Sequence, residues 1–300
     1  MDFVSSEEKL ERRFAERLDA VRDIPTFPRV VARLAEVLAR PGSTMGAVAE
    51  AIQEDPAVTA RLLKLVNSAY YRRTAGGAPI GSVPFAVTRV GLEEIREIVT
   101  TLSVFSLFPG KWKNADRVAF WRHCLDAALA ARALRARTAG RVGWGPDADD
   151  RLHVAGLLHD LGVVVLDRYF RPEFTGVLAV ARRSGVPLHE AERAMIGLDH
   201  AAAGAAVARR WRLPPAIVEA IRHHHDPGDA RPEHRAFCAA VHVADFVCRA
   251  GEAGLADRAG ETVSQDALAA LGLAASDLDE IAADARTHAD RAGTLAELAA

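Results

Sequence analysis

The spacing of apolar residues constrains the fold of this chain more than any other feature of its sequence. In almost every long segment, apolar residues recur three and four positions apart, which is the period of an amphipathic α-helix. Alanine is abundant, and β-branched residues rarely alternate with polar ones as they do in a half-buried strand. The sequence therefore predicts an all-α protein.

Proline and glycine divide this helical chain into parts. A charged entry helix is expected within residues 1–23, before the Ile-Pro-Thr-Phe-Pro break at 24–28. Pro-Gly-Lys at 109–111 closes a first half, and a second half begins near residue 114. The Ala- and Asp-rich tail at 251–300 is expected to form one or two peripheral helices. The helices between these limits are expected at 29–39, 44–54, 57–71, 82–90, 92–107, 115–138, 150–161, 172–184, 187–196, 199–212, 214–225 and 232–250.

Composition and charge exclude several classes of protein. The 38 Lys and Arg against 40 Asp and Glu give a formal net charge of −2, which provides no general attraction to nucleic acid or to an anionic membrane. The three cysteines lie far apart without a CxxC pair, which excludes a disulfide framework and a thiolate zinc site. Residues 1–20 are too charged for a signal peptide, and no apolar run spans a bilayer. We therefore predict a soluble, cytoplasmic protein without a membrane partner.

Histidine and aspartate side chains lie on helix faces that should be buried. His123 borders the small-residue stripe of its helix, and His159 follows Ala155 and Gly156 by one turn. Asp160 comes directly after His159 in an apolar context, where an unpaired carboxylate is costly. Buried charges are usually paired or bind metals, so these residues are candidate ligands.

Further positions extend this pattern along the second half. Asp245 lies on an apolar helical stripe, and His200 begins a helix that Asp199 can cap. His224 and His225 end another helix, where the partial negative charge of the helix favours a cation. A ligand set of His and Asp without thiolates suits iron, manganese or zinc.

Each of these residues also has an ordinary structural interpretation. A single His on an apolar face is more often a hydrogen-bonded core residue than a ligand, a His-rich helix end is more often a solvated cap, and Asp245 could pair with one of the many arginines. The order His, His-Asp, His, His-His, Asp along the chain is stronger evidence than any one member. The remaining histidines outside this order are assigned no role: His153, His189, His234, His242 and His288.

That order resembles the HD superfamily of metal-dependent phosphohydrolases and, more specifically, its regulatory relatives in the HDOD family. The resemblance covers about residues 24–250 and implies an HDOD domain there, with an N-terminal helical module at 24–112 packed on an HD-type helical core at 114–250. The motifs that carry it are IPTFP at 24–28, DPAVTARLLKLVNSA at 55–69, GLLHDLG at 156–162, Glu192, GLDH at 197–200, Gly204, WRLP at 211–214 and His224-His225.

The resemblance also implies a set of metal positions and a cofactor. They would converge on one site holding mono- or binuclear iron or manganese, with His159 and Asp160 as the central residues of any catalysis. Two departures argue against catalysis: Val163 replaces a lysine of the cyclic-dinucleotide phosphodiesterase branch, and Asp226-Pro227 stands where that branch has a Gly-Tyr-Pro loop. Such a lysine would stabilise negative charge on phosphate, and Arg222 is one candidate to replace it. The implied ligands are His123, His159, Asp160, His200, His224, His225 and Asp245.

Three functions remain open on the sequence. The resemblance favours a non-catalytic regulatory protein, of a kind often found in bacterial signal transduction, that acts through a signalling protein partner or a small ligand. The first alternative is a metal-dependent phosphohydrolase acting on a nucleotide or a cyclic dinucleotide. The third is DNA binding through helices at 44–54 and 57–69, but the apolar residues of the second helix assign it mainly to the core, so we do not expect a nucleic-acid partner.

Overall fold

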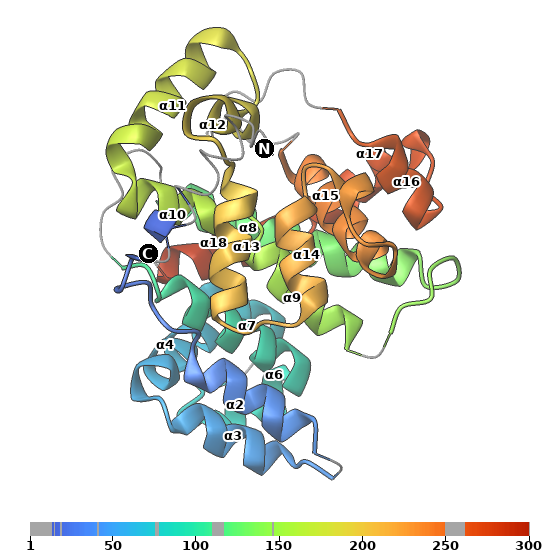
Figure 1. Cartoon of the computed structure of the whole chain (residues 1–300). Coiled ribbons are helices and arrows are strands. Elements are labelled where there is room, and N and C mark those ends of the chain that lie inside the picture. The colour runs from blue at the N-terminus through green and yellow to red at the C-terminus, as the bar shows by residue number, and fades with distance from the viewer. Residues whose placement is uncertain are drawn as a thin grey trace. The chain divides into compact units, whose positions relative to one another are not determined.

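The computed structural model describes residues 14, 16–18, 20–40, 42–75, 78–109, 117–145, 147–249 and 262–299. All regular elements among these residues are helices, so the all-α prediction is confirmed (Figure 1). None of the described helices has both the length and the apolar character needed to cross a membrane. Of the expected entry helix, residues 14, 16–18 and 20 are helical, and residues 1–13, 15 and 19 lie outside the described part.

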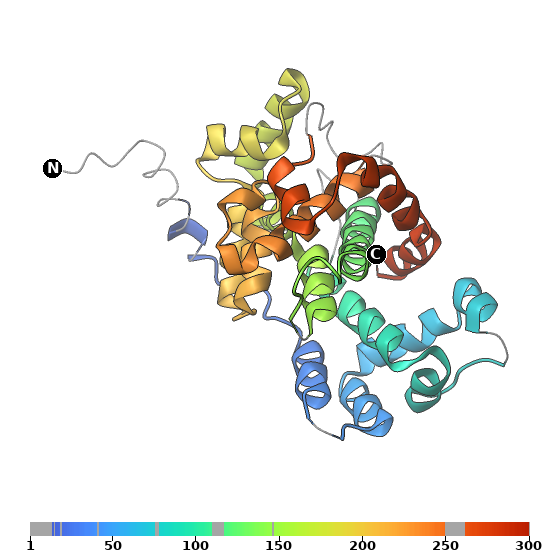
Figure 2. The ribbon, with the colours of Figure 1, turned by 90° about the vertical axis from the view of Figure 1, so that its right-hand side faces the viewer.

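The chain forms two compact units, each assembled from two stretches of sequence. The small unit contains Pro25–Gly110 and Ala289–Ala300, and the large unit contains Met1–Ile24 and Lys111–His288. Figure 2 shows the small unit's N-terminal helices in blue to teal and the helices after residue 262 in orange to dark red. Each unit is described separately below.

Helix α7 is the centre of the small unit. It spans Leu92–Phe105, and Ile95, Ile98 and Leu102 are among its buried side chains. It packs against α2, α4, α6 and α18. The helices of this unit are α2 (Arg29–Leu38), α3 (Met45–Gln53), α4 (Pro56–Val66), α5 (Ala69–Ala75), α6 (Val83–Val90), α7 and α18 (Ala289–Ala299).

Local polar residues begin and end helix α4. Asp55 accepts hydrogen bonds from the amides of Ala57 and Val58, and Pro56 occupies the first position of the helix. The expected helix at 57–71 is divided at Asn67. Its side-chain amide donates to the carbonyls of Leu63 and Ile80 at 2.7 and 2.8 Å, and its Oδ1 accepts from the amide of Ile80 at 2.8 Å. These bonds end α4 and fix to it the loop that precedes α6.

Close approaches between helix backbones shape the large unit. Helix α8 packs against α9 and α15, and α10 packs against α13. A Cβ at Gly156 would lie 2.5 Å from the Cα of Ala128, and a Cβ at Gly162 would overlap the carbonyl of His200, so these crossings require glycine. The α-helices of this unit are α8 (Arg117–Arg137), α9 (Ala148–Leu158), α10 (Leu161–Tyr169), α11 (Arg171–Ser184), α12 (Leu188–Ile196), α13 (His200–Arg210), α14 (Pro215–His223), α15 (Arg235–Arg249), α16 (Gln265–Leu271) and α17 (Leu278–Arg286).

The sequence does not predict helix α10. The helix expected at 150–161 ends at Leu158 as α9, and a separate helix begins at Leu161. Residues 161–167 are all buried, so α10 has no polar face and its run of three valines shows no amphipathic period. The junction between α9 and α10 consists of His159 and Asp160.

The tail beyond residue 250 contributes to both units. Its described residues form α16, α17 and α18, whereas the sequence predicts one or two peripheral helices. Residues 251–261 lie outside the described part. Leu268, Leu271 and Ile281 are buried, so α16 and α17 extend the core of the large unit, while α18 belongs to the small unit.

Candidate metal centre

Helix ends and buried helix faces bring all seven predicted ligands together inside the large unit. His159 and Asp160 form the α9–α10 junction, and His200 is the first residue of α13. His224 and His225 follow the end of α14. His123 lies in the second turn of α8, and Asp245 lies one turn before the end of α15.

Asp160 is the hub of the cluster and is 1% exposed. Its Oδ1 lies 3.1 Å from Nε2 of His200 and 3.6 Å from Nε2 of His224. Its Oδ2 lies 3.4 Å from Nε2 of His159 and 3.9 Å from Nε2 of His123. One carboxylate therefore faces four imidazole rings.

Asp245 and His225 complete the cluster on two further sides. Oδ1 of Asp245 lies 3.0 Å from Nε2 of His123 and 3.5 Å from Nε2 of His159. Nε2 of His225 lies 2.8 Å from Nε2 of His200. Ligand atoms of three overlapping triads lie within 4.8 Å of one another, which is near the spacing of donors placed about 2.1 Å from a shared ion. The triads are His123, His159 and Asp160; His159, His224 and Asp245; and His200, His224 and His225.

The outer nitrogens of the rings fix which nitrogen faces the cluster. Nδ1 of His159 donates to the carbonyl of Gly156 at 2.7 Å, and Nδ1 of His224 donates to the carbonyl of Ile221 at 2.8 Å. A carbonyl oxygen only accepts, so Nδ1 carries the proton and the neutral ring presents a bare Nε2 to the cluster. Both of these Nε2 atoms are buried without a hydrogen-bond partner in the described part of the chain. This is the ring arrangement that metal-binding histidines adopt, and it fits a cation.

The protonation preferences of the cluster follow from burial and from its two carboxylates. Burial lowers the pKa of His224 to about 3 and holds the pKa of His225 well below its ordinary value. Burial alone would also depress His200, but the charge of Glu192 and the hydrogen bonds of Asp160 and Glu192 raise its pKa to about 10. Burial opposes ionisation of Asp160, yet the charge of His159 and the surrounding histidine hydrogen bonds lower its pKa. The cluster thus combines neutral rings at His224 and His225 with a protonated ring at His200 and an ionised carboxylate at Asp160.

Three residues around the cluster contact its members and position them. None of the three is predicted from the sequence to be a ligand or to support one. Glu192 accepts hydrogen bonds from both the amide and Nδ1 of His200, each at 2.7 Å. His242 donates from Nδ1 to the carbonyl of His224 at 2.7 Å and accepts from the amide of Ser264 at 2.9 Å. The ring of His189 stacks on that of His225 with centroids 4.0 Å apart. Of these, Glu192 was detectable as a carboxylate on a buried helix face, the same signal that marks Asp245.

The cation beside the cluster differs from the one that the sequence suggested. Arg222 donates to Asp199 at 3.4 Å, and that aspartate caps α13 by accepting from Ala202 at 2.7 Å. Arg249 instead binds the cluster directly, because its Nε donates to Oδ1 of Asp245 at 2.6 Å. Val163, at the position of the missing lysine, is buried in α10.

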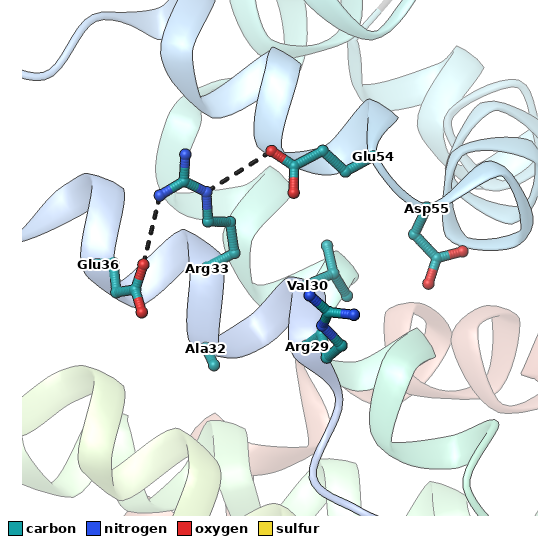
Figure 3. Close-up of a pocket in the computed structure, with 7 residues that line it drawn as sticks. All are labelled: Arg29, Val30, Ala32, Arg33, Glu36, Glu54 and Asp55. Carbon is teal, nitrogen blue, oxygen red and sulfur yellow. Dashed lines mark hydrogen bonds and ion pairs between the residues drawn. The ribbon is translucent and has the colours of Figure 1, made fainter.

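Described residues line a cavity in each unit. A cavity of about 220 Å³ in the large unit adjoins the cluster, and His189, His225, Asp245 and Arg249 are among its lining residues. Figure 3 shows the cavity of about 470 Å³ in the small unit, where Arg33 pairs with Glu36 and Glu54. That second cavity contains none of the predicted ligands. The cluster is otherwise enclosed, since His159, His200 and His224 are all 0% exposed.

The order and convergence of these ligands agree with a family match. The model of the HDOD domain matches residues 24–227. This chain belongs to the HDOD domain family. An uncharacterized protein of Treponema pallidum (strain Nichols) is 27% identical over 241 residues, which is 80% of this chain and 44% of that protein, so this HDOD chain spans less than half of that relative.

Solved structures share the HDOD fold over nearly the whole chain. An HDOD domain protein of unknown function from Geobacter sulfurreducens is 27% identical, has a TM-score of 0.76 and is matched over 96% of both chains. A candidate metal-dependent phosphohydrolase from Shewanella amazonensis SB2B is 28% identical, with a TM-score of 0.53 over 94% of this chain and 100% of that one. The HDOD fold of this chain is therefore similar both to a protein without a known activity and to one named for metal-dependent hydrolysis.

Proposed function

We propose that this HDOD chain holds an iron or manganese ion at the His/Asp cluster and acts as a regulatory protein of signal transduction, by binding a protein partner or a small ligand rather than by turnover. The observation that carries the metal is the inward orientation of the rings. Nε2 of His159 and of His224 faces Asp160 at 3.4 and 3.6 Å while each Nδ1 is fixed by a backbone carbonyl. A carboxylate and neutral imidazoles without thiolates suit a hard or borderline divalent ion.

Five residues of the cluster have a defined task in that proposal. His159, His224 and His225 would supply neutral nitrogen ligands, and Asp160 would supply negative charge. Glu192 would orient His200 as a carboxylate partner of a ligand histidine. A bound ion would lower the pKa of a coordinated water, which is the chemistry that hydrolysis would require.

The surroundings of the cluster favour binding over hydrolysis of phosphate esters. Stabilising the transition state needs a positioned cation near the phosphate oxygens. Val163 offers only an apolar side chain, and Arg222 and Arg249 are engaged by Asp199 and Asp245. The adjoining cavity of about 220 Å³ is also smaller than the roughly 300 Å³ at which pockets for drug-sized ligands begin, and a cyclic dinucleotide exceeds that size class.

The alternative is a metal-dependent phosphohydrolase acting on a small phosphate ester. It is supported by the same cluster and by the 28% identity to the Shewanella amazonensis protein. In this alternative His159 and Asp160 would hold the ion at the reacting phosphate. DNA binding stays a prediction of low rank, because Leu62 and Leu65 of α4 are buried and Lys64 is its exposed basic residue.

Elemental analysis followed by a phosphodiesterase assay tests the proposal. We expect purified protein to carry iron or manganese, and Asp160→Asn to lose it while remaining helical by circular dichroism. We expect no turnover of cyclic dinucleotides or of a small aryl phosphate above the rate of the Asp160→Asn control. Metal-dependent turnover that this variant abolishes would favour the alternative, and a metal-free protein that cannot be loaded would exclude both.

A further inference from the structure

Two consecutive residues of α12 hold two consecutive residues at the start of α13. Glu192 accepts from both the amide and Nδ1 of His200, as described above. Beside it, Nε of Arg193 donates to Oδ2 of Asp199 at 2.6 Å, and Asp199 is the N-cap of α13. The last turns of α12 therefore fix the helix end that carries His200.

Arg193 also reaches a second segment that carries ligands. Its Nη2 donates to Oδ2 of Asp226 at 3.0 Å, and Asp226 directly follows His225 in the chain. The donors of a guanidinium lie in one rigid plane, so a single arginine can serve two carboxylates at once. Arg193 thus joins the N-cap of α13 to the residue that follows the histidine pair of α14.

The two ends of this bridge differ in exposure. The side chain of Asp199 is 0% exposed, whereas those of Arg193 and Asp226 are 39% and 50% exposed. A buried carboxylate is costly without a cation, so the Asp199 end anchors the guanidinium. Arg222 adds a longer bond to the other oxygen of Asp199, at 3.4 Å. The Asp226 end then holds the exposed segment after α14 against that anchor.

The helix ends that the bridge joins belong to one ligand triad. Nε2 of His225 lies 2.8 Å from Nε2 of His200, and both rings form a triad with His224. His200 and His225 are 25 positions apart on different helices, so their spacing depends on contacts between helix ends. Residues that orient ligands from outside the first layer of a metal site affect how tightly the ion is bound.

We propose that Arg193 is a positioning residue of the metal centre, which bridges Asp199 and Asp226 and so fixes the spacing of His200 and His225 for a shared ion. This inference rests on the proposed metal site. It assigns to one cation a favourable effect on the binding of another, because the geometry that Arg193 imposes outweighs its repulsion of the ion.

Charge and geometry predict opposite effects of removing Arg193. If its guanidinium acted only through its charge, Arg193→Met would tighten the binding of a metal ion, because a positive group near the ion is lost. If it positions the histidines, the same variant weakens binding. The double variant Arg193→Met with Asp226→Asn removes one charge of each sign and cuts the same bridge, so it isolates the geometric effect.

Arg231 offers a matched control on the same helix. Its Nη2 donates to Oε1 of Glu219 in α14 at 3.1 Å, and its side chain is 57% exposed. This pair resembles that of Arg193 and Asp226 in length and exposure. Among the described residues the guanidinium of Arg231 pairs with Glu219 and with neither end of the bridge. Arg231→Met therefore removes a comparable arginine and leaves the bridge intact.

The test is Mn²⁺ binding to chelator-treated full-length protein, measured as the loss of the free-ion electron paramagnetic resonance signal. We expect Arg193→Met and the double variant each to bind Mn²⁺ about tenfold more weakly than wild type, and Arg231→Met to stay within about twofold of it. Arg193→Lys keeps the charge and covers the case in which Arg193→Met does not fold. It should still bind Mn²⁺ about threefold more weakly, because an ammonium group lacks the planar fork that spans both carboxylates.

Bound Co²⁺ gives a second readout, since its visible absorption reports the number and geometry of its ligands. We expect altered absorption bands in the double variant and bands like those of wild type in Arg231→Met. Mn²⁺ binding by Arg193→Met or by the double variant that equals or exceeds that of wild type overturns the inference, as does a Co²⁺ spectrum that the double variant leaves unchanged. If wild type itself binds neither ion, the proposed metal function fails.

Discussion

The two units bury charged groups in opposite ways. In the small unit, Arg291 of α18 donates to Glu97 at 2.5 Å and pairs with Glu94 at 2.9 Å, and Glu94 accepts from the hydroxyl of Tyr71 at 2.5 Å. Burial, the largest influence, together with the charge of Glu94 raises the pKa of that hydroxyl. A fixed guanidinium and its carboxylates satisfy one another there. The large unit instead turns imidazole nitrogens and carboxylate oxygens toward the same enclosed space.

This difference distinguishes a structural ion pair from a binding site. An arginine between two glutamates needs no further group, because donors and acceptors match. An unprotonated Nε2 and a carboxylate oxygen are both hydrogen-bond acceptors, so they repel each other at short distance. A proton or a metal ion between them turns this repulsion into attraction. Burial of charge is common to both units, and the balance of donors and acceptors singles out the large unit as the one that carries the candidate metal centre.

Breaking the ion pair of the small unit should have the largest effect on stability. Arg291→Ala leaves Glu97 buried without its guanidinium, and we expect it to lower the free energy of unfolding by about 4 kcal/mol. Replacing both partners, as Arg291→Met with Glu97→Leu, should restore most of the loss. Urea denaturation with and without Mn²⁺ measures this. If Mn²⁺ restored the free energy of unfolding that Arg291→Ala loses, the ion pair of the small unit and the metal centre of the large unit would not be independent.

A methyl group added where α10 crosses α13 in the large unit should lower the free energy of unfolding somewhat less. In Gly162→Ala the new Cβ overlaps the carbonyl of His200, so α10 and α13 must separate, and we expect a loss of about 3 kcal/mol together with weaker Mn²⁺ binding. Gly176→Ala is the control, because its Cβ would lie 3.6 Å from the terminal methyl of Met195 in ordinary contact. That variant should be neutral or more stable by up to about 1 kcal/mol.

Removing the metal should affect one unit only. At about 100 times the dissociation constant, a bound ion stabilises the native state by about 2.7 kcal/mol, and chelation removes this. Hydrogen exchange should then quicken in α9, α13 and α14, whose ends carry the ligands, and stay unchanged in α7 and α18. Equal changes in both units would show that the ion acts on the whole chain rather than on its own centre.

Loss of the hydrogen bonds that His242 makes beside the cluster should give the smallest change in the free energy of unfolding. His242→Leu removes the donor to the His224 carbonyl and the acceptor for the Ser264 amide, and we expect a loss of about 1 to 2 kcal/mol. His234→Gln, at a partly exposed residue before α15, should change stability by less than about 0.5 kcal/mol. Thermal unfolding compares the two variants. Equal melting points would show that the hydrogen bonds of His242 do not stabilise the cluster.

The sequence predicts the features that depend on neighbouring residues along one helix. Helical periodicity predicts the all-α fold, and the buried faces of His123, His159 and Asp245 indicate which polar residues lie inside. Helix α10 escapes this reasoning because a helix buried on every side has no period to detect.

Contacts between distant residues could not be predicted in the same way. Glu192 binds His200 across the α12–α13 turn, and His242 reaches His224 from another helix. The sequence suggested Arg222 as a cation for the site, yet Arg249 holds that place. Which of many arginines meets a given aspartate depends on how helices cross, and helical spacing alone does not determine that.

The assignment of α18 to the small unit has a consequence for the order of events during synthesis. Glu97 emerges from the ribosome long before Arg291, since 194 positions separate them. All ligands of the metal centre are made in that interval, so the large unit can close while α7 still lacks its partner. A nascent small unit therefore lacks the guanidinium that pairs with Glu97, and its final packing waits for a helix translated after every residue of the His/Asp cluster.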